Sequence, residues 1–146
     1  MSDGGQSLDL NTISQEFVFT GDAASMAAAR DHMMDFLREY CSGEQEEIDI
    51  FLALQEALAN AVLHGCRSDP SAMVRAWVEI DAATISIVIR DPGAGFDHQS
   101  LTNCAPDAVN LSQHGRGICM MRSLMDAVSF QRGGSEVHLS KYRSAR

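Results

Sequence analysis

A long apolar stretch lies near the middle of the chain and contains only three polar positions. Residues 50–63 are apolar apart from Gln55, Glu56 and Asn60, and His64 follows directly. This pattern predicts a helix buried against the rest of the fold. Glu56, Asn60 and His64 are spaced by four, so a helix aligns them along one narrow line. The line indicates either a site facing a cavity or a paired structural carboxylate, because an unpaired buried carboxylate is costly.

Hydrophobic periodicity predicts further elements on both sides of this helix. Before the apolar helix, the pattern predicts a strand at 16–20, a helix from 21 to about 40 and a capping box at 42–45; the apolar helix itself ends at about 64. After it, the pattern predicts strands at 74–80 and 84–89 and a loop at 91–114. A helix at 117–125 and strands at 127–131 and 136–139 complete the chain. The order β-α-α-β-β-loop-α-β-β predicts an α+β fold. We expect a two-layer sandwich, with helices on one face of a mixed, mostly antiparallel sheet.

Length and charge narrow the class of protein. The 146 residues form most simply one domain, with residues 1–12 as a flexible tail and residues 13–143 as the domain. A net charge of -9 and scattered basic residues argue against direct nucleic-acid binding. The sequence has no apolar run of about 18 residues and no signal peptide, so we expect no membrane span and a cytoplasmic protein. The cysteines form no CxxC pair, which favours reduced thiols.

A first candidate site follows the strand at 84–89. Asp91 begins the segment DPGAGFD, in which Gly93 and Gly95 allow the backbone to approach a flat ligand. An aspartate at a strand end can accept a hydrogen bond from an exocyclic amine. The same residues are also typical of an ordinary turn, so on this evidence alone both interpretations stay open.

A second candidate site is the segment Gly115-Arg116-Gly117, which precedes an apolar helix. Amides at a helix N-terminus, together with the helix dipole, favour an anion. A plain turn remains the alternative, since neither a Rossmann nor a Walker fingerprint is present. Between Phe96 and His114 there is no Lys or Arg. A bound triphosphate would therefore need a divalent cation besides Arg116 and the amides, and the Asn60 oxygen is a suitable Mg²⁺ ligand.

Taken together, these segments resemble a known superfamily. Residues 56–65 resemble the N box of the GHKL (Bergerat-fold) ATPases, residues 91–97 their first glycine box and residues 115–117 their second. The short lid, the chain length and the closing MRSLMD resemble most closely the anti-sigma-factor serine/threonine kinases of bacterial partner-switching systems. The resemblance covers about residues 14–142. It implies a histidine-kinase-like ATPase domain of the Bergerat fold, with ATP and Mg²⁺ as cofactors.

The resemblance also implies roles for the matching residues of the nucleotide site. Glu56 corresponds to the general base that activates a substrate hydroxyl, and Asn60 to the Mg²⁺ ligand. Asp91 corresponds to the carboxylate that reads the adenine amino group, while Gly93 and Gly95 shape the base pocket and the lid hinge.

Further roles implied by the resemblance concern phosphates and partners. Gly115, Arg116 and Gly117 correspond to the phosphate-binding segment, with the two glycine amides in contact with phosphate. Arg30 falls where such kinases contact both the sigma factor and the anti-anti-sigma (STAS-type) substrate. A solvated helix arginine is its alternative. Homodimerisation is expected from the family alone.

Three functions are compatible with the sequence to different degrees. The leading hypothesis is ATP-dependent phosphorylation of a serine or threonine on a small partner, coupled to sequestering a sigma factor. A non-catalytic nucleotide-binding switch module is the alternative, although such a module would not need a base at Glu56. The ATP-binding half of a histidine kinase fits less well, because no dimerising hairpin precedes the fold and His32 lacks the usual following Glu and Pro.

Overall fold

The computed structural model describes residues 12–67, 69–96 and 113–143, and at 113–115 only the backbone. Most of the predicted tail lies outside these residues. The described helices and strands are, in order, β1 (Ile13–Thr20), α2 (Ala23–Arg38), α3 (Glu44–Asn60), the π-helix η1 (Ala61–Gly65), β2 (Met73–Ile80), β3 (Thr84–Arg90), α4 (Gln113–Leu124), β4 (Ala127–Gln131), the 3₁₀ turn η3 (Arg132–Gly134) and β5 (Glu136–Tyr142). Their order confirms the predicted succession of elements.

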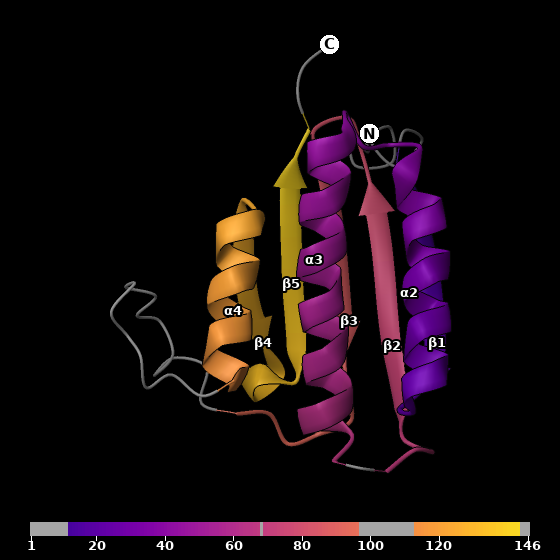
Figure 1. The fold of residues 1–146 in the computed structure, drawn as a ribbon, viewed down its shortest axis with the longest axis vertical. Coiled ribbons are helices and arrows are strands. Elements are labelled where there is room, and N and C mark those ends of the chain that lie inside the picture. Colours follow the sequence, from indigo (N-terminus) through magenta and orange to yellow (C-terminus); the bar gives the residue numbers. More distant parts are fainter. Residues whose placement is uncertain (1–11, 68, 97–112, 144–146) are drawn as a thin grey trace, which may run out of the picture.

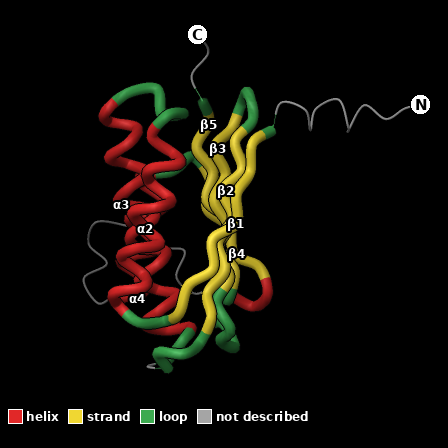
Figure 2. The backbone as a smooth tube through the Cα atoms, turned by 90° about the vertical axis from the view of Figure 1, so that its right-hand side faces the viewer, coloured by secondary structure: helices red, strands yellow, loops and turns green. Residues whose placement is uncertain are grey.

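The molecule is a two-layer sandwich of one sheet and one layer of helices. The sheet has the strand order β1-β2-β3-β5-β4, and every described pairing is antiparallel, so no part of it is mixed. Helices α2, α3 and α4 cover one face, with α3 between the other two (Figures 1 and 2). The predicted α+β class is confirmed. Within the described residues, no helix is long and apolar enough to cross a membrane.

The core lies between α3 and the central strands. In β2 and β3 alternate side chains point toward the helices, as the period of two requires. The buried strand residues are Val74, Ala76, Val78, Ile80, Ile85, Ile87 and Ile89. Against them α3 buries Ile50, Ala53, Leu54, Ala57 and Leu58. The apolar run seen in the sequence is therefore the inner face of the central helix.

The starts of β1 and α3 differ from the sequence-based expectation. β1 begins at Ile13, because pairing with Ile80 of β2 extends the ladder beyond the aromatic run. The capping box was wrong: α3 has Gly43 as N-cap, without a side-chain hydrogen bond. Instead, Glu46 Oε1 accepts a hydrogen bond from the Ser42 N–H at 2.8 Å. The amide of Ser42 lies before the helix, which begins at Glu44. The helix therefore starts one residue later than a capping box with Ser42 as N-cap predicts.

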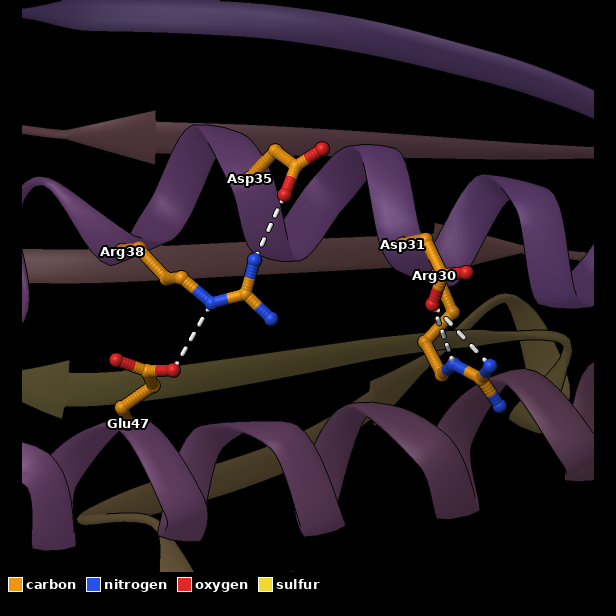
Figure 3. A network of polar contacts seen from close by, with 5 residues as sticks. All are labelled: Arg30, Asp31, Asp35, Arg38 and Glu47. Carbon is orange, nitrogen blue, oxygen red and sulfur yellow. Dashed lines mark hydrogen bonds and ion pairs between the residues drawn. The ribbon is translucent and has the colours of Figure 1, made fainter.

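Exposed ion pairs connect α2 with α3 at the helix surface. Arg38 donates to Asp35 Oδ1 at 2.7 Å within α2 and to Glu47 Oε2 of α3 at 2.9 Å (Figure 3). Arg30 and Asp31 form a second ion pair, closer to the start of α2 than the Arg38 contacts (Figure 3). Such exposed pairs contribute little each, so apolar burial is what holds these helices together.

The cysteines only partly fit the expected reduced state. Cys41 and Cys66 are free thiols, and burial raises the pKa of both. Cys119 of α4, in contrast, is disulfide-bonded. The expectation of reduced thiols is therefore wrong at Cys119 and right at the other two described cysteines.

Replacing a buried leucine of α3 should test how much this packing stabilises the fold. Leu54→Ala should lower the free energy of unfolding by about 2–5 kcal/mol, because a fully buried side chain leaves a cavity. Leu52→Ala on the outer side of the same helix is the control and should cost about 1 kcal/mol or less, since Leu52 is 39% exposed. Urea denaturation measures both. Equal losses would contradict the proposed packing of α3.

Candidate functional site

The polar line of α3 ends in a widened helical turn. After Asn60 the chain continues as the π-helix η1, in which the Cys66 N–H donates to the Ala61 carbonyl at 2.9 Å. Single π-turns of this kind occur often at functional sites. The turn brings Gly65 against the end of β3, where a Cβ on Gly65 would lie 2.1 Å from Asp91 Cγ. No side chain fits at residue 65 while Asp91 keeps this position.

Asp91 is held in place by backbone contacts on both sides. Its N–H donates to the Ser135 carbonyl at 2.9 Å, which continues the β3–β5 ladder by one residue. Its Oδ1 accepts from the Gly93 N–H at 2.8 Å. Burial raises the pKa of the Asp91 carboxyl above its ordinary value, and the Gly93 N–H offsets this only in part. The structure thus holds a carboxylate, which is a hydrogen-bond acceptor, partly buried at the end of a strand.

A cavity opens beside Asp91 between the helix layer and the sheet. It is a partly open cleft, and the figure of about 430 Å³ for its space includes open solvent. Asn60 and His64 line it from α3 and η1, and Asp91 and Gly95 line it from the end of β3 and the following loop. Its apolar walls come from Ile89, Phe96, Met121, Phe130 and Val137. An apolar chamber with a few polar groups is the usual form of a small-ligand site.

A glycine turn that sequence analysis treated only as a strand connection forms part of the cavity wall. Gly95 has a φ of +87°, and a Cβ there would lie 2.1 Å from the Gly133 carbonyl oxygen. That oxygen accepts the Phe96 N–H at 2.9 Å. Gly134, with a φ of +105°, lines the cavity. The adjacent pair Gly133-Gly134 was the available signal, but its contact with Gly95 depends on tertiary structure.

Glu56 and Asn60 face the second glycine segment across the α3–α4 contact. A Cβ on Gly117 would lie 2.5 Å from Glu56 Oε1 and 3.6 Å from Asn60 Nδ2. The bare Gly117 backbone therefore leaves the space that the two side chains occupy. Asn60 Nδ2 is buried and has no hydrogen-bond partner. A buried N–H donor without a partner is costly, so an acceptor atom supplied by a ligand would stabilise this position.

The second glycine segment begins differently from the sequence prediction. α4 starts at Gln113, so Gly115 and Gly117 lie inside the helix and not in a turn before it. Gly115 belongs to the first turn, where amides have no acceptor within the helix. Gly117 lies one turn in, where an N–H normally bonds to the carbonyl four residues earlier. In this structure Gly117 allows α4 to approach Glu56 closely. Arg116, the residue before it, is exposed.

Arg30 lies apart from the cavity, at the contact between α2 and α3. Its Nη1 donates to Gln55 Oε1 at 2.9 Å, and its guanidinium also pairs with Asp31 and lies 5.6 Å from the centre of the Phe51 ring. The side chain is 23% exposed. Arg30 thus connects two helices and still presents an edge to solvent.

Comparison with known proteins gives matches of three kinds. Residues 19–141 match the family described as histidine kinase-like ATPase domain. A protein named anti-sigma F factor from Geobacillus sp. is 30% identical over 144 residues, which cover 92% of this chain and 90% of the relative. The anti-sigma F factor of Bacillus cytotoxicus is 28% identical over 134 residues, covering 86% and 90%.

The third kind of match is a crystal structure of the RsbU and RsbW domains of a Mycobacterium tuberculosis protein. It superposes with a TM-score of 0.57 at 19% identity, covering 92% of this chain and 34% of the other. This chain therefore spans about a third of that protein, and the match supports the fold alone.

The buried carboxylate of Asp91 should make the fold less stable than an amide would at neutral pH. The folded state raises the pKa of Asp91, so it binds the proton more tightly than the unfolded chain does. The resulting cost is absent below the unfolded pKa, where both states are protonated, and complete above the folded pKa. Asp91→Asn, whose amide oxygen can still accept from Gly93, should therefore gain stability relative to wild type as the pH rises.

Urea midpoints of wild type and Asp91→Asn between pH 4 and pH 8 measure this difference. Asp69→Asn is a matched control, since hydrogen bonds from Ser71 lower the pKa of that exposed carboxyl. Because the stabilisation from that carboxylate is lost only below its ordinary pKa, the stability of Asp69→Asn relative to wild type should stay nearly constant over this range. A pH-independent difference for Asp91→Asn would contradict the assigned burial.

Proposed function

The chain belongs to the histidine kinase-like ATPase domain family, in the group that contains the anti-sigma F factors, and on this premise we propose that it is an ATP-dependent protein kinase. It phosphorylates a serine or threonine of an anti-anti-sigma (STAS-type) partner and, in the alternate complex, sequesters a sigma factor. The observation that carries the proposal is the unpartnered, buried Asn60 amide beside Glu56, on the wall of a cavity that Asp91 also lines.

The cavity suits the base of an adenine nucleotide. Asp91 offers a carboxylate oxygen to the exocyclic amine, and the apolar walls contact the faces of the ring. A side chain at Gly65 or Gly93 would collide with Asp91, and one at Gly95 would collide with the Gly133 carbonyl. The bare backbone therefore lets the Asp91 carboxylate keep its position beside the cavity, where it is a fixed acceptor for the amine of the base.

The Asn60 end of the cavity suits the phosphates and their cation. Among the described residues, no group of three or more His, Cys, Asp or Glu side chains is arranged to hold a metal ion. Mg²⁺ fits such a site, since it commonly takes one or two protein oxygens and fills its other positions with phosphate and water. When bound, the cation neutralises phosphate charge. Amides of the first turn of α4, including that of Gly115, supply further donors.

Glu56 is placed to accept the proton of the substrate hydroxyl. The hydroxyl oxygen forms a bond to the γ-phosphorus while the bond from that phosphorus to the β–γ bridging oxygen breaks, and ADP leaves. The hydroxyl proton passes to the Glu56 carboxylate. Catalysis of this reaction is mostly positioning, and a helix packed on both sides is a more rigid platform than a loop.

Arg30 is proposed to contact the protein partners. Its edge is exposed at the α2–α3 surface, one residue away from Glu56 along α3 through its bond to Gln55. Glu56 itself faces α4 on the other side of α3, so a partner that contacts Arg30 would have to extend across α3 to reach the carboxylate. Homodimerisation is part of the proposal and rests on family membership.

Substitutions of Glu56 and Asn60 should separate chemistry from binding. Glu56→Gln keeps the size and hydrogen bonding of the side chain but removes the base, so Mg-ATP affinity should survive. The rate of phosphate transfer to the copurifying partner should fall by about 100-fold or more. Asn60→Ala should lose Mg²⁺-dependent ATP affinity and transfer together. Calorimetry and phosphate incorporation at saturating Mg-ATP are the measurements.

Ala59→Ser, on the same helix between the two residues, is the control and should leave both quantities near wild type. Full turnover in Glu56→Gln would rule out the base. Nucleotide binding by the wild type without transfer to any copurifying partner would favour the non-catalytic switch module.

Arg30 can be tested apart from its helix contact. Arg30→Ala should weaken the complex with the STAS-type partner by about tenfold or more, as truncation of an interface arginine often does. Gln55→Ala removes the same interhelical hydrogen bond and keeps the guanidinium, so partner affinity should stay close to wild type. ATP affinity should be unchanged in both. Equal weakening by the two variants would mean that Arg30 serves the α2–α3 contact only.

A further inference from the structure

A charged cluster lies on the face of the sheet that none of the described helices covers, directly behind the candidate site. Glu136 of β5 accepts from Arg90 Nε of β3 at 2.6 Å, and its other oxygen lies 2.6 Å from His138 Nε2. The Glu136 side chain is only 6% exposed, although it points away from the helices. The Arg90 guanidinium also lies over the Trp77 ring, 5.1 Å from its centre. Both carboxylate oxygens are therefore satisfied.

This cluster holds the two strand ends that carry the site. Arg90 and Glu136 are direct cross-strand partners and the last pair of the β3–β5 ladder. The next residue on one strand is Asp91, and the preceding residue on the other is Ser135, joined by the Asp91 N–H bond. Because side chains alternate between faces, Asp91 and Ser135 face the cavity while Arg90 and Glu136 face away.

The position of Asp91 needs such support. Its carboxylate is partly buried, which disfavours its charged form, and the loop after it begins at once. A frayed strand end would let the carboxylate turn toward water and lose its depth in the cavity. A charge-assisted bond with one buried partner resists this movement more than an exposed pair does. Burial alone would raise the pKa of Glu136, but the bonds from His138 and Arg90 outweigh it and keep the carboxyl ionised.

We propose that Arg90 and Glu136 are positioning residues for recognition of the nucleotide base: by clamping the ends of β3 and β5 from the uncovered face, they fix the Asp91 carboxylate at the depth where it accepts the exocyclic amine. The proposal rests on the nucleotide site described above. It assigns a specificity role to residues that touch no ligand. The phosphate-binding end, built on α3 and α4, does not depend on them.

The test compares ligands that differ only where Asp91 would read them. Inosine triphosphate carries a carbonyl where adenine has the amine, and inorganic tripolyphosphate has no base. We expect the wild type to bind Mg-ATP at least about tenfold more tightly than Mg-ITP. Glu136→Gln and Arg90→Gln should weaken Mg-ATP by about tenfold and leave Mg-ITP and Mg-tripolyphosphate unchanged, as Asp91→Asn should. Arg90→Lys, which keeps a charged donor, should retain most of the preference.

Glu16→Gln is the matched control, since it breaks the exposed Arg75–Glu16 pair between β1 and β2, away from the cavity. It should leave the ATP-to-ITP ratio unchanged. A wild-type ratio in folded Glu136→Gln and Arg90→Gln would overturn the positioning role, and so would an equal loss for all three ligands together with a lowered unfolding midpoint. A wild type that binds neither triphosphate would overturn the proposed function itself, before any variant is compared.

Discussion

Burial of α3 between the sheet and its two neighbouring helices is the constraint on which the rest of the structure depends. The helix must be apolar to pack on β2 and β3, yet it carries Glu56 and Asn60 at its contact with α4. Gly117 makes this compatible, because its missing side chain leaves the space that the carboxylate and the amide occupy. Packing and chemistry are thus built on one helix, so the functional groups share the rigidity of the core.

The site separates two kinds of recognition along that helix. At one end the Asn60 amide, buried without a partner, stands beside the first turn of α4 and suits charged ligand atoms. At the other, Asp91 and apolar walls suit a flat base. The carboxylate of Asp91 is kept in a setting that raises its pKa, so this acceptor is maintained at some expense of folding stability. Strain of that kind is typical of binding groups that a ligand later satisfies.

The uncovered sheet face is more than a solvated surface. Its Arg90–Glu136 pair closes the same two strands whose next residues line the cavity. Any partner that contacted this face would therefore act on the strand ends that hold Asp91.

The sequence by itself determined the order of elements, the polar line Glu56–Asn60–His64 and the strand-end position of Asp91, because periodicity and spacing are local properties. It also indicated the family through three short segments. Tertiary structure alone decided that Gly133-Gly134 meets Gly95, that Gly117 faces Glu56, and that Gly43 and not Ser42 caps α3. It likewise decided that Arg90 and Glu136 pair behind the cavity, 46 residues apart in the chain. These contacts join distant segments, and only the strand register and the helix packing set their distances.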